Sequence, residues 1–233
     1  MAVDPTALVE DGVVLGADVE IGPFAVVRAG TVLGDGVTVG EHAVLGKRPK
    51  LGPRSTAAQG ELGPLEVGAG ATISTHAVVY AGTAIGEGAI IGDQAFVRER
   101  CRIGTGTVIG RGVTVENDTV IGAGCRVQSQ SYITAKSVLE DDVFIAPCVV
   151  TTNDNLMGRT ERRHALTQGP TIRRGARIGG AVVLCPGIEV GEEAFIGAGA
   201  VVTRDVPART VLVGVPARVL RDVPDDELRA NGG

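Results

Sequence analysis

The sequence predicts an all-β protein, folded as a triangular coil of short parallel strands in which each turn stacks on the one before. Three observations support this prediction. Aliphatic residues recur at every sixth position along nearly the whole chain, 35 of the 233 residues are glycine, and only 3% are aromatic. The glycine content is about twice the ~7% of ordinary proteins, which allows frequent sharp turns. Because few aromatic side chains are present to fill volume, the core must be thin and built from Val, Ile, Leu and Ala.

The first part of the repeat runs from Val9 to Leu45 in six-residue steps. Most of its aliphatic residues are followed by glycine, as in Leu15-Gly16, and a second apolar residue precedes most of them by two positions. Inward-facing residues two positions apart are typical of a strand. The remaining residues of each hexad, rich in Gly, Asp and Glu, are typical of a turn. Each hexad is therefore predicted to form one short strand and one turn.

The repeat resumes at Val67, runs unbroken to Thr151, and has a third part from Ile172 to Val202. With three hexads to each triangular turn, the chain is expected to make about nine coils, joined by parallel backbone hydrogen bonds. Residues 18 positions apart then become neighbours on successive coils. The predicted inward ladder contains Ile85, Ile103 and Ile121. The predicted column of outward turn residues contains His42, His76, Gln94, Gln130 and Cys148.

Two insertions, at residues 46–66 and 152–171, interrupt the repeat. With both removed, the second follows the first by five turns of eighteen residues, so we expect both loops to leave the same corner, about 24 Å apart at ~4.8 Å per coil. Residues 1–223 are expected to form one coiled domain, and residues 224–233 a tail with a short helix from Asp225 to Ala230. Long loops on a rigid scaffold often carry binding residues, although such loops can also serve only to hold subunits together.

Composition and charge exclude several classes of function. A net charge of −5 without a broad basic face argues against nucleic acid as a partner. The chain does not open with a basic segment followed by an apolar run, and no apolar stretch is long enough to span a bilayer, so no membrane partner is expected. The four cysteines form no CxxC pair. This pattern favours free thiols in a reducing compartment, and we expect a cytoplasmic protein.

The tandem pattern [LIV]-G-x-x-x-x resembles the hexapeptide-repeat acyltransferases over about residues 7–219. The resemblance implies a left-handed parallel β-helix, and the hand is implied by the family alone, because right-handed crossovers are the general rule for parallel strands. It also implies a homotrimer with sites between adjacent prisms. Two alternatives share the repeat, namely γ-class carbonic anhydrases and non-catalytic assembly subunits. A carbonic anhydrase needs three His ligands near one metal, and His42, His76 and His164 include no closely spaced pair, so no metal is expected.

Residues 127–154 are similar to the nucleotide-sugar N-acetyltransferases of this family, which act on amino-deoxy sugars. The family pattern is matched by Gln128, Glu140, Asp141, Asp142, Asn153 and Asp154. It is broken where Ser129 and Gln130 replace a pair of asparagines, one of which is thought to hold the acceptor amine. The resemblance implies transfer of an acetyl group from acetyl-CoA to the amine of a dTDP- or UDP-linked amino sugar. Another small amine or hydroxyl acceptor remains open.

The site residues expected from this resemblance and from their chemistry fall into three groups. The expected catalytic residues are His164, Gln130, Asn153 and Asp154. The expected substrate-binding residues are His76, Arg159, Glu140 and Asp142. An imidazole with a pKa near 6.5 suits the removal of the amine proton, which favours His164 as general base. Two alternatives are His76 in a different geometry and direct attack by the neutral amine without a protein base.

The third group is the expected acetyl-CoA site. The run from Ile196 to Pro207, followed by residues 214–218, is similar to the acetyl-CoA end of the family's enzymes. Small residues there let the pantetheine amides approach the backbone, and arginines suit the nucleotide phosphates. The expected cofactor-binding residues are Ala198, Gly199, Arg204 and Arg218.

Overall fold

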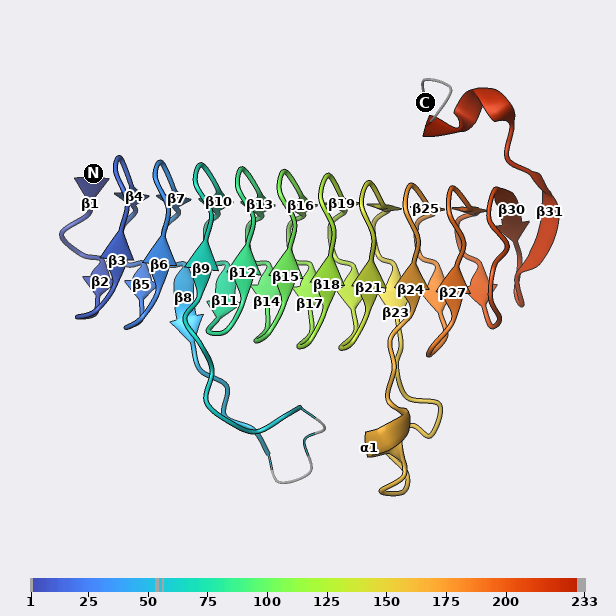
Figure 1. The fold of residues 1–233 in the computed structure, drawn as a ribbon, viewed down its shortest axis with the longest axis horizontal. Helices are drawn as coiled ribbons and strands as arrows, with labels where there is room; N and C mark the ends of the chain where they lie inside the picture. The colour runs from blue at the N-terminus through green and yellow to red at the C-terminus, as the bar shows by residue number, and fades with distance from the viewer. Residues whose placement is uncertain (1, 53–54, 56, 230–233) are drawn as a thin grey trace.

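The structure of the protein is a computed structural model that describes residues 2–52, 55 and 57–229. It is a straight, three-sided prism made of short strands, with two loops on one side and a tail that folds back at the C-terminal end (Figure 1). The helices within the described residues are α1 (Arg163–Leu166) and the single 3-10 turn η1 (Asp225–Glu227). Neither is long and apolar enough to cross a membrane.

The strands form three sheets, which we call faces A, B and C. Face A contains β1 (Ala2–Val3), β4 (Glu20–Ile21), β7 (Thr38–Val39), β10 (Thr72–Ile73), β13 (Ile90–Ile91), β16 (Val108–Ile109), β19 (Arg126–Val127), β22 (Phe144–Ile145), β25 (Arg177–Ile178), β28 (Phe195–Ile196), β30 (Thr210–Val213) and β31 (Arg218–Asp222). Face B contains β2 (Leu8–Val9), β5 (Val26–Val27), β8 (Val44–Lys47), β11 (Val78–Tyr80), β14 (Phe96–Val97), β17 (Thr114–Val115), β20 (Tyr132–Ile133), β23 (Val150–Thr151), β26 (Val183–Leu184) and β29 (Val201–Val202). Face C contains β3 (Val14–Leu15), β6 (Val32–Leu33), β9 (Glu66–Val67), β12 (Ala84–Ile85), β15 (Arg102–Ile103), β18 (Val120–Ile121), β21 (Val138–Leu139), β24 (Thr171–Ile172) and β27 (Glu189–Val190).

The predicted fold class is confirmed, because successive coils pair in parallel with the register that the hexads require. Ile85 lies opposite Ile103, and Ile103 lies opposite Ile121, as predicted for the inward ladder. The prediction of about nine coils is too low. Strand β1 precedes the first expected hexad, and β30 adds a further rung to face A after the last one.

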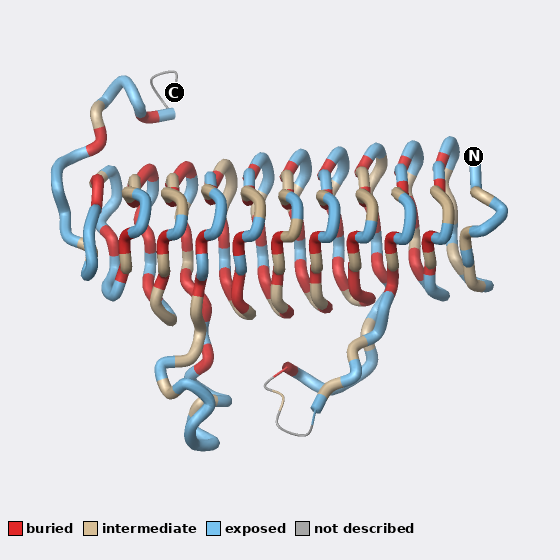
Figure 2. The backbone as a smooth tube through the Cα atoms, turned by 180° about the vertical axis from the view of Figure 1, so that it is seen from behind, coloured by how far each residue is buried: buried red, intermediate tan, exposed pale blue. Residues whose placement is uncertain are grey.

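The core is a narrow column of the inward residues, and Figure 2 marks buried residues as red segments of the backbone in successive coils. Most of these residues are fully buried, but Val9 and Leu15 in the first turns are only partly buried. The four cysteines are free, and two of them, Cys101 and Cys125, lie in the core. Burial raises the pKa of the Cys101 thiol to about 12 and that of Cys125 to about 11, so both thiols are inert at neutral pH.

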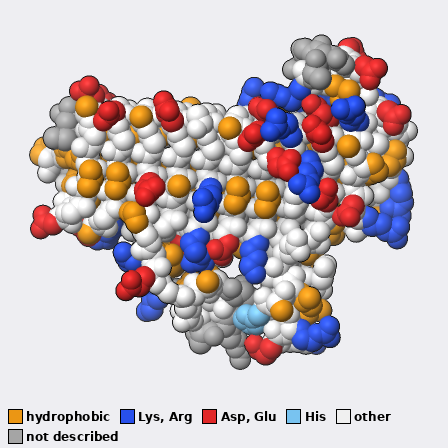
Figure 3. All heavy atoms as spheres, viewed as in Figure 1, with side chains coloured by type: hydrophobic (Ala, Val, Ile, Leu, Met, Phe, Trp, Pro, Cys, Tyr) orange, Lys and Arg blue, Asp and Glu red, His pale blue; other side chains and the backbone are white. Residues whose placement is uncertain are grey.

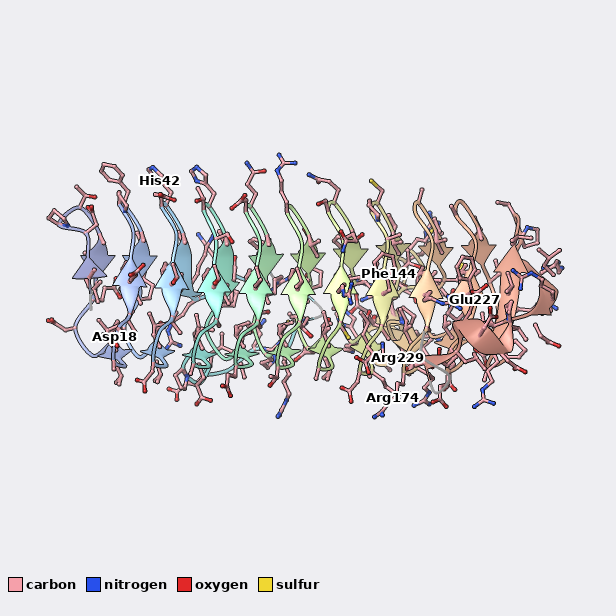
Figure 4. The ribbon with its side chains drawn as sticks, turned by 90° about the horizontal axis from the view of Figure 1, so that it is seen from above. Asp18, His42, Phe144, Arg174, Glu227 and Arg229 are labelled. Atoms are coloured by element: carbon pink, nitrogen blue, oxygen red, sulfur yellow. The ribbon has the colours of Figure 1, made fainter. Side chains whose placement is uncertain are left out.

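The corner between faces A and B carries the predicted column of turn residues, and Figure 4 shows His42 on this edge. Its side chains stack in register. The ring centroids of Phe24 and His42 are 5.0 Å apart, and those of His42 and His76 are 4.9 Å apart. Each column residue sits at positive φ, 63° for Gln130 and 61° for Cys148. Each of them therefore occupies the left-handed position of its turn, and the 18-residue arithmetic is confirmed.

Both loops leave the corner between faces B and C, as predicted. The first connects β8, which ends at Lys47, to β9, which begins at Glu66. The second connects β23, which ends at Thr151, to β24, which begins at Thr171. Strands β8 and β23 are five rungs apart on face B. Two opposite views show that the two loops project from the same side of the prism and lean toward each other (Figures 1 and 2).

The tail departs from the expected continuation of the coil. Strand β31 pairs antiparallel with β30, so the parallel coil ends before residue 218. The tail then turns back, and Val223 and Leu228 pack against Val211 and the partly buried Phe195. The expected helix from Asp225 to Ala230 is reduced to η1, and its last residue lies outside the described part of the chain.

Candidate active site

The expected site residues are distributed over all three corners of the prism. Gln130 and His76 lie on the corner between faces A and B. The second loop, with its candidate residues, leaves the corner between faces B and C. Glu140 and Asp142 follow β21 and lie on the corner between faces C and A. Gln130 and the second loop therefore stand at opposite edges of face B within one chain.

Three hydrogen bonds hold the base of the second loop, two of them to the coil and one between its own two ends. Asn153 Nδ2 donates to the carbonyl of Ala135 over 3.2 Å, and the Gln168 amide donates to the Asn153 carbonyl over 3.0 Å. Lys136 Nζ donates to the carbonyl of Thr167 over 3.3 Å. The loop is thus fixed at both ends, and it leaves the coil as a folded unit.

Within the second loop, Asp154 organises the first turn. Its two carboxylate oxygens accept from the amides of Leu156 and Gly158 over 2.8 and 2.7 Å. The Gly158 and Leu156 hydrogen bonds hold the pKa of Asp154 below its usual value. The carboxylate is therefore already engaged in shaping the loop, which agrees better with a positioning role than with direct contact to substrate.

His164 is the exposed imidazole of the second loop. It lies in α1, its Nε2 is 3.3 Å from Glu161 Oε2, and 38% of its side chain is exposed. Arg159 in the same loop is also exposed. The loop therefore presents an imidazole beside a carboxylate, together with a cation, toward solvent.

A charged network that the sequence analysis did not single out lies on the corner between the two loops. Glu99 has a fully buried side chain, and Arg98 clamps it with Nε and Nη2 over 3.1 and 2.8 Å. Arg98 Nη1 also donates to Glu116 over 2.9 Å. Arg100, which follows Glu99 in the sequence, clamps Asp118 with Nε and Nη2 over 2.5 and 3.1 Å. Both clamps join residues 18 positions apart or adjacent in sequence, so the register arithmetic would have found them.

Arg100 also borders the first loop. Together with Arg48 and Gln59 it lines a cavity of about 330 Å³, and no carboxylate is among the described residues of its lining. Burial has the largest single effect on the Asp118 carboxyl and opposes its charge. The hydrogen bonds from Arg100 and Asn117, together with the charge of Arg100, outweigh burial and lower the pKa of that carboxyl. Arg100 is therefore held in place by an acidic partner, and the first loop has a positively charged hollow.

Glu140 and Asp142 are engaged in ion pairs. Glu140 accepts from Arg173 Nη1 over 2.7 Å and from the Arg174 amide over 3.0 Å. Asp142 lies 3.1 Å from Arg229 Nη2 in the tail. Figure 3 shows the acidic and basic side chains interleaved over this C-terminal end of the prism. These contacts stabilise the last turns and leave the two carboxylates with structural partners.

The residues expected to bind acetyl-CoA lie on the last turns, at separate positions. Ala198 and Gly199 form an exposed turn on the corner between faces A and B. Arg204 is exposed on the corner between faces B and C, and Arg218 lies in β31, where its Nη1 donates to the Ala217 carbonyl over 2.8 Å. Among the residues that the structure describes, no group of three or more His, Cys, Asp or Glu side chains is placed to hold a metal ion.

The repeats match two models of known repeat families. The model for bacterial transferase hexapeptide repeats matches residues 12–47 and 169–204, and that for the hexapeptide repeat of succinyl-transferase matches residues 97–129. The chain is 38% identical over 88 residues to galactoside O-acetyltransferase of Escherichia coli, which covers 36% of this chain and 43% of that protein. It is also 38% identical over 85 residues to serine acetyltransferase of Buchnera aphidicola, which covers 36% of this chain and 29% of that protein. The matches thus span less than half the length of these two curated relatives.

Solved structures share the fold over nearly the whole chain. UDP-N-acetylglucosamine acyltransferase of Arabidopsis aligns with 99% of this chain and 77% of its own, at a TM-score of 0.56 and 20% identity. The enzyme of the same name from Francisella novicida aligns with 99% of this chain and 73% of its own, at a TM-score of 0.55 and 17% identity. At such identities the likeness is one of fold.

Proposed function

From the hexapeptide repeats that the chain shares with bacterial transferases, we propose that it is a CoA-dependent acetyltransferase. It moves the acetyl group of acetyl-CoA to the amine of a dTDP- or UDP-linked amino sugar. The observation that carries this proposal is the second loop, which is tied to the coil at both ends and presents His164 beside Glu161. The curated relatives, both named acetyltransferases, support the reaction class.

The chemistry requires three things of the protein. It must hold the amine near the thioester carbon, accept one amine proton, and stabilise the oxyanion that develops on the carbonyl oxygen. The amine nitrogen bonds to the acetyl carbon, the carbon–sulfur bond breaks, and CoA leaves as the thiolate. The thiolate becomes the thiol when it takes up the proton that His164 has accepted from the amine. His164 accepts the amine proton, and Glu161 stabilises the resulting imidazolium. Asn153 and Asp154 position the loop that carries this base.

We propose that the site is completed between chains, in a homotrimer. Within one chain Gln130 and His76 are separated from the second loop by the width of face B, and the expected donor residues Ala198 and Gly199 share the corner of Gln130. Prisms packed side by side bring the corner of one chain against the loop of the next. The acceptor then meets the second loop of one subunit and the Gln130 corner of its neighbour.

The anionic part of the acceptor would be recognised by arginines. Arg159 is exposed on the second loop, and Arg48 and Arg100 line the positively charged hollow of the first loop. Guanidinium groups hold phosphate oxygens with paired, charge-assisted hydrogen bonds. A nucleotide-linked sugar, which carries two phosphates next to its sugar ring, fits this distribution of charge better than a neutral acceptor.

The proposal is tested by incubating the protein with acetyl-CoA and a panel of dTDP- and UDP-amino sugars while free thiol is followed. We expect thiol release that depends on one of these amines. We further expect His164→Ala to lower kcat by about 10²–10⁴ with little change in KM, and the deficit to shrink at high pH, where the amine is already neutral. Glu20→Gln, at an exposed outward position of β4 near the N-terminal end of face A, serves as the control. Wild-type turnover by His164→Ala at neutral pH would exclude His164 as the base and leave direct attack by the amine or a role for His76.

A hydroxyl acceptor is the second candidate, because the curated relatives include a galactoside O-acetyltransferase. The same assay separates the two when sugars with a free hydroxyl in place of the amine are added to the panel. Thiol release with the hydroxyl sugars alone would replace the amine proposal. No release with any acceptor, at millimolar concentration, would favour a non-catalytic assembly subunit.

A further inference from the structure

Four outward side chains alternate between cation and aromatic ring along face A. Arg126 on β19, Phe144 on β22 and Arg177 on β25 occupy equivalent positions on successive rungs, followed by Phe195 on β28. Neighbouring rungs are ~4.8 Å apart, so Phe144 lies on a rung between two arginines and Phe195 lies on the rung next to Arg177. The Arg177 guanidinium lies over the ring of Phe195, 5.1 Å from its centroid.

The tail covers this part of face A and leaves a cavity beneath it. The cavity holds about 690 Å³, with Arg126, Phe144 and Arg177 on its floor. Tail residues Asp226, Glu227 and Arg229 also line it, as do Asp142 and Glu193. Figure 4 shows Phe144, Glu227 and Arg229 gathered over the C-terminal part of face A. Three contacts hold the tail there: Arg177 Nη1 to Glu227 over 3.0 Å, Arg229 Nη2 to Asp142 over 3.1 Å, and the Arg229 amide to Glu193 over 3.2 Å.

Arg177 has an unused pair of donors. Its Nε and Nη2 atoms are buried and have no hydrogen-bond partner among the described residues. These are the same two atoms with which Arg98 clamps Glu99 and Arg100 clamps Asp118. An arginine presents this edge as a planar fork that fits a carboxylate or phosphate. Two of the three forks are therefore filled by acids, and that of Arg177 is left without one.

A buried donor without an acceptor is costly, and the described part of the tail gives Arg177 a single hydrogen bond, which Nη1 donates. We propose that the Arg177 fork is a binding site for the phosphate of a nucleotide, and that Glu227 holds the guanidinium until the nucleotide arrives. Both atoms are buried in this structure, so the phosphate reaches them only when the side chains that cover them move.

The nucleotide class follows from the surroundings of the fork. Phe144 is adjacent to Arg177 in register and 37% exposed, so its ring offers an apolar face on which a flat base stacks. Arg126, on the other side of Phe144, is exposed and supplies a second positive charge. A cavity of about 690 Å³ falls within the range of small-ligand sites. A ligand that has both a flat base for Phe144 and a phosphate for the arginines is a nucleotide, either free or as the nucleotide end of a CoA molecule.

The test measures binding by calorimetry at low salt, without turnover. Its result is therefore independent of whether the protein catalyses the proposed acetyl transfer. The probe is AMP, with inorganic phosphate and adenosine as its two halves. We expect AMP to bind the wild-type protein and Arg177→Gln to weaken it by at least about 10-fold. Arg177→Lys keeps the charge over Phe195 but lacks the fork, and should lose a similar factor. Glu227→Gln should tighten AMP binding, because it removes the competing carboxylate.

Arg102→Gln is the matched control, since Arg102 is an exposed outward arginine on face C and its loss removes the same charge. It should leave AMP binding unchanged. Phe144→Leu should weaken AMP and leave phosphate alone unaffected. Displacement of AMP by acetyl-CoA would assign the site to the donor's nucleotide, and simultaneous binding would assign it to a free nucleotide. The proposal is overturned if AMP does not bind at millimolar concentration, or if it binds Arg177→Lys as tightly as wild type.

Discussion

Gly104 and Gly106 stand in the same turn between faces C and A, and they are expected to tolerate a methyl group to very different degrees. A Cβ on Gly104 would lie 2.5 Å from both the Gly122 carbonyl oxygen and the Ala123 amide nitrogen on the next coil. A Cβ on Gly106 would meet nothing within 4 Å, but its φ of +64° is one that L residues rarely adopt. The first glycine is required by the close stacking of coils, the second only by its backbone angle.

The expected costs follow from these two situations. Ordinary contact at Gly104 requires the next coil to withdraw by about 1 Å, which stretches the hydrogen bond from the Gly104 amide to the Ile121 carbonyl, now 2.8 Å long. Overpacking of this kind costs about 1–3 kcal/mol, and the weakened backbone bonds add about 0.5–1.5 kcal/mol each. The left-handed backbone of Gly106→Ala costs about 1–2 kcal/mol, offset by about 0.4–1 kcal/mol of unfolded-chain entropy.

The measurement is equilibrium unfolding in urea, followed by far-UV circular dichroism, with the midpoint and slope compared between variants. We expect Gly104→Ala to lower the free energy of unfolding by about 3 kcal/mol or more, and Gly106→Ala by about 1 kcal/mol, on the estimates above. If Gly106→Ala lowered the free energy of unfolding as much as Gly104→Ala or more, the close stacking of coils would not explain why Gly104 is a glycine.

Three further predictions concern the core, the donor site and the second loop. Ile103→Asp should cost several kcal/mol in the same unfolding assay, because it buries an unpaired carboxylate. Arg204→Ala should weaken acetyl-CoA binding by about 1.5–3 kcal/mol if Arg204 contacts a phosphate, and equal affinity in a calorimetric titration would show that it does not. Backbone hydrogen bonds lower the pKa of Asp154, so its contacts to Leu156 and Gly158 should persist above its ordinary value of ~3.9 and be lost only as the pH falls through the lowered pKa. Hydrogen exchange of these two amides at pH 5 and pH 3 checks this, and exchange that is already fast at pH 5 would contradict it.

Most of the fold follows from the sequence because one short rule, inward residue and turn, is repeated with little variation. The step from Leu45 to Val67 is itself enough to locate the first loop, since a solenoid accepts an insertion only at a turn. The C-terminal end of the coil does not follow this repeat and could not be predicted from it. Strand β31 and the tail are held by Val223 and Leu228 against residues far away in sequence, and no periodicity marks such contacts.

The sequence was sufficient to predict which segments carry the candidate site residues, but not how these segments are placed relative to one another. The sequence indicated the second loop and the Gln130 column, and the structure places them at opposite edges of face B. Cys148 belongs to the same column of turn residues as Gln130, and Asp154 lies six residues, or one hexad, after it. Because each hexad carries the chain to the next corner, Asp154 lies in the loop at the corner between faces B and C and not on the Gln130 corner. The roles of Asp154 and Glu140 were not apparent from sequence either, because their partners are the loop's own amides and Arg173.

The five rungs between the two loops set their separation in fixed increments. Both loops leave one corner, from β8 and β23, so the distance between their roots is a whole number of ~4.8 Å steps, about 24 Å in this chain. A duplicated or deleted coil of eighteen residues would lengthen or shorten that gap by one step, and the added coil would bring its own core residues and backbone partners. The spacing of the two loops can therefore change by whole coils, independently of the residues on either loop.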